Sequence, residues 1–70
     1  MTDLEKLEQT FKEIGLEYEK IEYDIIEVAE YDGEAEYNVS IKINNGIGFF
    51  DSFCKFYFLE GKFQKHGCWE

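Results

Sequence analysis

A single helix signal opens this sequence, and every later segment has the patterning of β-strands. Thr2 and Glu5 match a capping box, the arrangement that starts many helices. Apolar residues then recur at helical spacing: Leu4, Leu7, Phe11 and Ile14. Gly15 is a favourable residue just past a helix end. We expect one amphipathic helix over residues 3–14, which is too short to be stable alone and must pack on a sheet.

The first strand-like segment, residues 16–31, is long and unbroken by Gly or Pro. Its apolar parity switches at Ile25–Ile26, as a β-bulge would cause, so it is either one bent strand or two short ones. Asp32–Gly33 is a strong signal for a two-residue hairpin turn. With that turn, Val28 would oppose Tyr37 and Ile26 would oppose Val39.

Three further strands follow, over about 34–44, 49–59 and 62–69, and the last two are joined at Glu60–Gly61. Helix then meander is the simplest α+β arrangement. We therefore expect a single domain, 1–70, in which the helix packs on an antiparallel sheet of four strands, or five if the first segment splits. The order is α-β-β-β-β. A chain of this length buries only about 60% of its unfolded surface, and 19% aromatic residues supply the dense core that it needs.

The segment 49–59 is apolar on both of its faces. One helix covers one face of a sheet, so the other aromatic side chains either pack under a curl of the sheet or lie open. An open aromatic patch with an acidic rim is typical of a protein interface. Phe49, Phe53 and Tyr57 are the candidate partner-binding residues here, and a homodimer seam is the alternative interpretation.

The charge is strongly negative: sixteen Asp and Glu against seven Lys and no Arg, a net charge of −9. Such a chain repels nucleic acid and anionic membranes, and it attracts proteins with basic surfaces. Nine carboxylates with a single lysine lie in one twenty-residue stretch: Glu17, Glu19, Glu22, Asp24, Glu27, Glu30, Asp32, Glu34 and Glu36. Strand residues two apart point the same way at roughly 6.6 Å, so a hairpin could carry a line of charge that imitates a phosphate backbone. A solvated face that resists edge pairing is the alternative.

Cys54, His66 and Cys68 are the only soft metal ligands. The Cys-x₂₋₄-Cys pairs of structural zinc sites are absent, so no metal or other cofactor is expected. No export signal and no apolar run of ~20 residues is present, which favours the cytoplasm and free thiols. A Cys54–Cys68 disulfide, or a small metal- or thiol-dependent site that includes His66, stays open. A lone His beside a Cys lacks the orienting group of a catalytic site, so we do not expect an enzyme.

In size, charge and antiparallel sheet content the chain resembles the small acidic proteins that bacteriophages and other mobile elements encode. Among these are DNA-mimicking inhibitors of host enzymes and anti-CRISPR proteins. The resemblance covers the composition of the whole chain and no particular residue. It implies a protein that blocks a larger host protein by occupying a nucleic-acid site or an allosteric surface. With the acidic charge, we expect an inhibitor of a cationic nucleic-acid-handling protein, in the host cytoplasm if the chain is phage-encoded. A structural or regulatory homo-oligomer without inhibitory role is the alternative.

Overall fold

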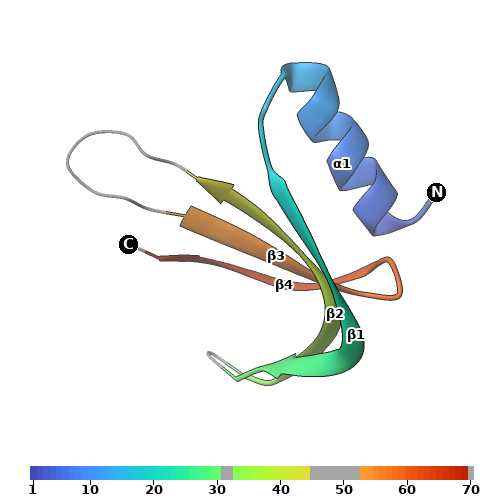
Figure 1. Ribbon diagram of the computed structural model, residues 1–70, viewed down its shortest axis with the longest axis vertical. Helices are drawn as coiled ribbons and strands as arrows, with labels where there is room; N and C mark the ends of the chain where they lie inside the picture. Colours follow the sequence, from blue (N-terminus) through green and yellow to red (C-terminus); the bar gives the residue numbers. More distant parts are fainter. Residues whose placement is uncertain (31–32, 45–52, 70) are drawn as a thin grey trace.

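The computed structural model describes residues 1–30, 33–44 and 53–69. One helix precedes four strands: α1 Asp3–Ile14, β1 Glu19–Ala29, β2 Ala35–Asn44, β3 Phe53–Leu59 and β4 Lys62–Trp69. The strands form an antiparallel meander in the order β1-β2-β3-β4 (Figure 1). The expected α-β-β-β-β fold is confirmed, and the first segment is one bent strand. The expected loop after Asn44 and the start of the third strand lie outside the described residues.

The start of α1 is held by the expected capping box. The Thr2 backbone N–H donates to Glu5 Oε1 (3.1 Å), and the Glu5 N–H donates to Thr2 Oγ1 (3.2 Å). The hydrogen bonds from the backbone and then the hydroxyl of Thr2 lower the pKa of the Glu5 carboxyl. Gly15 ends the helix in the left-handed conformation (φ 74°). Ile14 is 68% exposed and does not join the apolar stripe, because the chain reverses at Gly15 and Leu16 packs against the core instead.

The N-terminus of α1 docks on the turn between β3 and β4. The Leu4 N–H donates to the Gly61 carbonyl (3.0 Å), and the Phe63 N–H donates to Asp3 Oδ2 (3.0 Å). Glu60 and Gly61 both have positive φ, as the expected two-residue turn requires. A Cβ atom on Gly61 would lie 2.9 Å from the Thr2 Cβ atom. Glycine therefore allows both the turn and the close approach of the helix.

The main core lies between α1 and one face of the sheet. Leu4 and Phe11 of the helix pack with Ile41 of β2 and Phe58 of β3, and the last two are almost fully buried. The Phe11 ring also contacts Phe56, with 6.1 Å between centroids. These residues share a face because Ile41 pairs with Phe56 across the β2–β3 ladder and Phe58 lies two residues further along β3.

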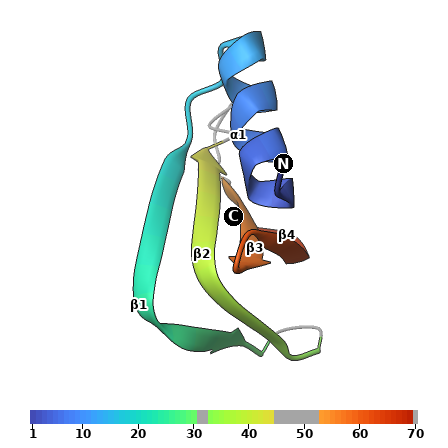
Figure 2. The same cartoon turned by 90° about the vertical axis from the view of Figure 1, so that its right-hand side faces the viewer.

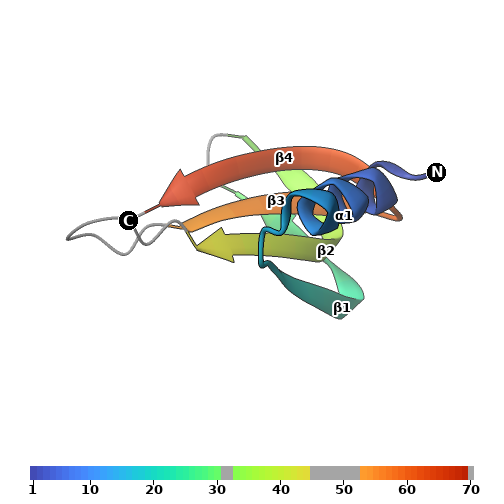
Figure 3. The same ribbon diagram turned by 90° about the horizontal axis from the view of Figure 1, so that it is seen from above.

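The β1–β2 hairpin bends sharply near its middle. Its pairing follows one register as far as Glu22 with Val39 and a different one from Glu27 with Tyr37, so the bulge expected near Ile25–Ile26 is confirmed. Beyond the bulge, the far half of the hairpin (residues 27–30 and 33–37) passes under β3 and β4, on the side opposite α1 (Figures 1 and 2). Seen from above in Figure 3, α1 lies over the sheet and the far half lies behind it.

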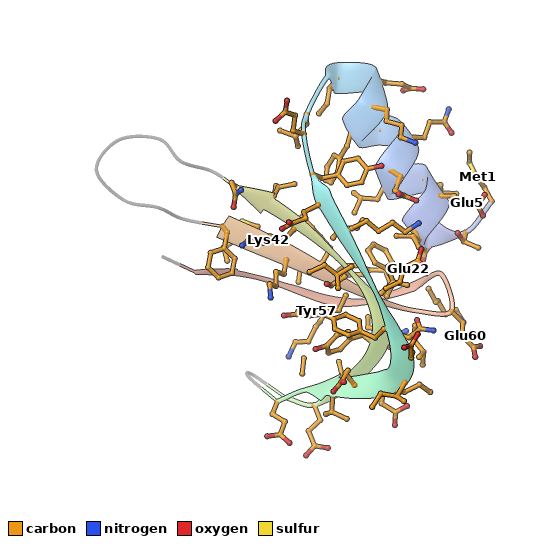
Figure 4. All side chains as sticks on the ribbon, in the orientation of Figure 1. Met1, Glu5, Glu22, Lys42, Tyr57 and Glu60 are labelled. Atoms are coloured by element: carbon orange, nitrogen blue, oxygen red, sulfur yellow. A yellow bond between two sulfur atoms is a disulfide. The ribbon has the colours of Figure 1, made fainter. Side chains whose placement is uncertain are left out.

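A second, smaller core fills the space under this curl. The Tyr37 ring lies 4.5 Å from the Tyr57 ring and 5.4 Å from the Tyr23 ring, measured between centroids. Tyr57 is only 6% exposed, and Ser40 beside it is fully buried. Figure 4 shows Tyr57 between β3 and the far half of the hairpin. Strand β3 is therefore covered on both sides, which explains why both of its faces are apolar.

The hairpin register differs from the expected one by one residue. Val28 pairs with Glu36 rather than Tyr37, and Ala29 pairs with Ala35. The expected pairing of Ile26 with Val39 does not form because the bulge removes residues 23–26 from the ladder. This register turns Tyr37 toward the second core and Val28 away from it. At the far end, Lys65 Nζ of β4 donates to the Gly33 carbonyl (2.8 Å).

Candidate protein-binding surface

The bulge divides the acidic stretch into groups that face different ways. Eight of the nine expected carboxylates lie in the described residues, and Asp32 lies outside them. Glu17, Glu19 and Glu22 precede the bulge. Asp24 is exposed within the bulge. A regular line of charge along the whole hairpin, as the two-residue step suggests, therefore does not form.

The group near α1 is partly neutralised. Lys20 Nζ lies 3.5 Å from Glu8 Oε2 and 3.4 Å from Glu22 Oε1, and Tyr18 donates its hydroxyl hydrogen to Glu8 Oε1 (3.1 Å). Burial acts to lower the pKa of Lys20, but Glu8 and Glu22 outweigh it and raise that pKa. Among the residues that the structure describes, these are the ion pairs of the acidic stretch.

The far half of the hairpin carries the remaining charge in an ordered way. Glu36 pairs with Val28 on the surface turned away from the second core, and Glu30 and Glu34 lie directly beside the adjacent ends of β1 and β2. We name Glu30, Glu34 and Glu36 the outer carboxylates, and all three are exposed. Side chains tipped with oxygen project from this end of the molecule in Figure 4. The outer carboxylates are thus open to solvent.

Glu27 is the exception in the far half, because it faces inward beside Tyr37. It is half-buried and pairs with Tyr37 across the ladder. Burial raises the pKa of the Tyr37 hydroxyl above its usual value of 10.0, and Tyr23, Tyr57 and Glu27 raise it further. Glu27 therefore contributes to the electrostatics of the second core more than to the outer surface.

The second core should make the fold sensitive to alkali. Because the pKa of Tyr37 is raised on folding, the unfolded chain releases this proton first as the pH rises. The contribution of the protonated Tyr37 hydroxyl to the free energy of unfolding is present below about pH 10 and is lost as the pH rises further. Urea unfolding across this range should show a smaller loss of stability in Tyr37→Phe than in the wild type. Equal losses in the two proteins would contradict a buried Tyr37 hydroxyl.

The three aromatic candidates have different environments. Tyr57 is buried in the second core, so it presents no surface to a partner and the curl, rather than an open patch, accounts for it. Phe53 is half-buried, and Lys42 Nζ and Lys55 Nζ lie 4.8 and 5.9 Å from its ring centroid. Phe49 lies outside the described residues. The direct pairing of Lys42 with Lys55 was not anticipated from the sequence, because it depends on the β2–β3 register.

Cys54 and Cys68 form a disulfide between β3 and β4. The expectation of free thiols is therefore wrong for this structure. The two residues pair directly across the ladder, with 4.0 Å between their Cα atoms, which brings the thiols together. His66 instead pairs with Phe56 and stacks near it, at 6.0 Å between ring centroids. Within the described residues no group of three metal-binding side chains is assembled, and the disulfide occupies both thiols.

Three exposed apolar residues adjoin the outer carboxylates. Ile25, Ile26 and Val28 are 67%, 53% and 46% exposed, and we name them the apolar edge. They lie at and just beyond the bulge of β1, which is an edge strand of the sheet. The parity switch at Ile25–Ile26 indicated the bulge, but it did not reveal that both isoleucines point to solvent.

These features define a small α+β domain with an acidic, bent hairpin. Comparison of the chain with protein-family models, with curated proteins and with solved structures finds no match. In the described part of the chain, no helix is long and apolar enough to cross a membrane. The function must therefore be argued from the surface itself.

Proposed function

We propose that this protein is a binding module that inhibits a larger, cationic nucleic-acid-handling protein, and that it acts without catalysis. One observation carries the proposal: the outer carboxylates are exposed together on a projecting hairpin and make no ion pair within the described residues. They would enter a groove that normally holds phosphates. The resemblance in composition to phage-encoded DNA mimics and anti-CRISPR proteins favours the same function.

The spacing of the outer carboxylates supports this kind of mimicry. Glu34 and Glu36 are two residues apart in the hairpin, so their side chains leave the surface roughly 6.6 Å from each other. Negative charge repeated at such a step resembles the repeating charge of a phosphate backbone. The net charge of −9 would also speed the encounter with a basic partner.

The proposal places the protein in the cytoplasm, where nucleic-acid-handling enzymes work. The Cys54–Cys68 disulfide counts against this compartment, because disulfides persist mainly in oxidising surroundings. In a reducing cytoplasm the two cysteines would be free thiols. The outer carboxylates lie on the β1–β2 hairpin, which does not contain these cysteines. The proposed activity therefore does not depend on the state of these cysteines.

Affinity capture tests the proposal. The immobilised protein is exposed to a bacterial lysate at low salt, and bound proteins are eluted with rising salt and identified. We expect a nucleic-acid-binding protein, whose release by salt reflects the screening of exposed charges. Its binding to DNA or RNA should then fall as this protein is added.

The variant Glu30→Gln/Glu34→Gln/Glu36→Gln should bind the captured partner about 100-fold more weakly. This estimate assumes that each carboxylate makes one exposed ion pair with the partner, which contributes up to roughly 1 kcal/mol to the binding free energy. A control with the same net charge, Glu13→Gln/Glu17→Gln/Glu60→Gln, places the changes elsewhere on the surface. It should bind almost as well as the wild type. If both variants lose affinity equally, net charge alone drives binding, and the outer carboxylates have no special role.

A further inference from the structure

The apolar edge is a concentrated exposure of hydrophobic surface. Single exposed apolar residues are common in soluble proteins, but here three of them fall within four positions of one strand. Contiguous apolar patches of this kind mark sites of interaction. Ile14, on α1, is just as exposed but is not part of such a group.

Both cores of the fold are complete without the apolar edge. The core under α1 is closed by residues of the helix, β2 and β3, and the second core is closed by Ala29 and three tyrosines. The apolar edge belongs to neither core. Because β1 is an edge strand and its ladder is interrupted from residue 23 to residue 26, the apolar edge has no neighbouring strand on its outer side.

Carboxylates surround the apolar edge. Asp24 lies within the same segment, Glu30 follows it, and Glu36 pairs with Val28 across the ladder. Residues 21–36 contain no lysine. An apolar centre with a polar rim is the usual arrangement of a protein interface. The sign of this rim restricts what can cover the centre.

A second copy of this chain would bring carboxylates against carboxylates, which costs affinity. Nucleic acid and anionic lipid would be repelled for the same reason. A protein surface with an apolar cleft bordered by Lys or Arg would bury the apolar edge and pair with the carboxylates around it.

We infer that the apolar edge inserts into an apolar cleft bordered by basic residues on the partner, beside the groove that receives the outer carboxylates. This inference rests on the proposed function and specifies the partner's surface. The carboxylates govern the rate of encounter and its dependence on salt, and the apolar edge slows dissociation and resists salt. Binding should therefore show a salt-dependent association rate and a dissociation rate that depends little on salt.

Two synthetic helical peptides of equal length and charge serve as probes. One is amphipathic, with leucine on one face and lysine on the other, and the second has glutamine in place of each leucine. At moderate salt the leucine peptide should bind the wild-type protein at least about 10-fold more tightly, because it buries the apolar edge. The variant Ile25→Ser/Ile26→Ser/Val28→Ser should lose this preference, whereas the control Ile14→Ser should keep it.

The outcomes separate the inference from the proposed function. If both peptides bind the wild type equally well, the inference is wrong and a purely charge-driven function remains. If neither binds at low salt, the proposed function fails as well. The inference would also be overturned if the wild type self-associates and the variant Ile25→Ser/Ile26→Ser/Val28→Ser does not, because the apolar edge would then join two copies. If the triple variant does not fold by circular dichroism, Ile25→Ser alone repeats the test at the most exposed position.

Discussion

Replacement of Phe58 by alanine lowers the free energy of unfolding by about 3–5 kcal/mol. Phe58 is 1% exposed and packs against α1 through the main core, so the change removes a large buried surface and leaves a cavity. A domain of this size has a total stability of roughly 4–10 kcal/mol. Urea or thermal unfolding followed by circular dichroism should find a variant that has lost a large part of this stability.

Phe63→Ala provides the matched control. Phe63 pairs with Phe58 across the β3–β4 ladder, and the two rings lie 5.8 Å apart between centroids, but Phe63 is 44% exposed. Its loss should cost about 1–2 kcal/mol, since much of the side chain is already in water. A similar loss of stability in both variants would mean that α1 does not bury Phe58 in solution.

Loss of the Cys54–Cys68 disulfide is the second large effect. The bond closes a loop with a sequence separation of 14, and for such a loop the chain-entropy argument gives roughly 3 kcal/mol. In a domain of this length that amounts to a decrease in melting temperature of about 10–20 °C. Thermal unfolding with and without a reducing agent measures it directly.

The variant Cys54→Ala/Cys68→Ala shows whether the effect belongs to the disulfide. It should melt near the temperature of the reduced wild type, and reducing agent should not change it further. If reduction leaves the melting temperature of the wild type unaltered, the ladder and the Glu60–Gly61 turn are sufficient to hold β3 and β4 together, and the disulfide adds no stability.

Local signals in the sequence were sufficient for most of the fold. The capping box at Thr2 and Glu5, the helix end at Gly15 and the turn at Glu60–Gly61 each depend on a few neighbouring residues, and the structure has all three. The bulge near Ile25–Ile26 was also readable, because a change of parity has no other simple cause in a continuous strand. The fold class follows from these features together.

The curl of the hairpin could not be predicted in the same way. Two apolar faces on β3 indicated either a curl of the sheet or an open aromatic patch, and the choice between them depends on the angle of the bend at the bulge. The expected register was wrong for a related reason: Val28 and Tyr37 are both apolar enough to pair, and the sequence does not reveal that Tyr37 packs against Tyr57.

The candidate site was predictable in composition but not in arrangement. The excess of carboxylates between Glu17 and Glu36 is plain in the sequence. Their division depends on the bulge, which leaves Glu22 beside Lys20, turns Glu27 inward and leaves Glu36 outside. The disulfide was only an alternative to free thiols, because the expected compartment favours reduced cysteines, whereas direct pairing of Cys54 with Cys68 depends on the register of β3 and β4.

The attachment of α1 to the β3–β4 turn has a consequence for the order of folding. Each strand pairs with its neighbour in sequence, so the hairpins can form from local encounters. The hydrogen bond from Phe63 to Asp3 instead joins residues 60 apart, and closing so long a loop costs conformational entropy before any contact is gained. We therefore expect the meander to assemble first and the helix to dock late. The helix precedes all four strands in the sequence, yet it would be the last of these elements to find its place.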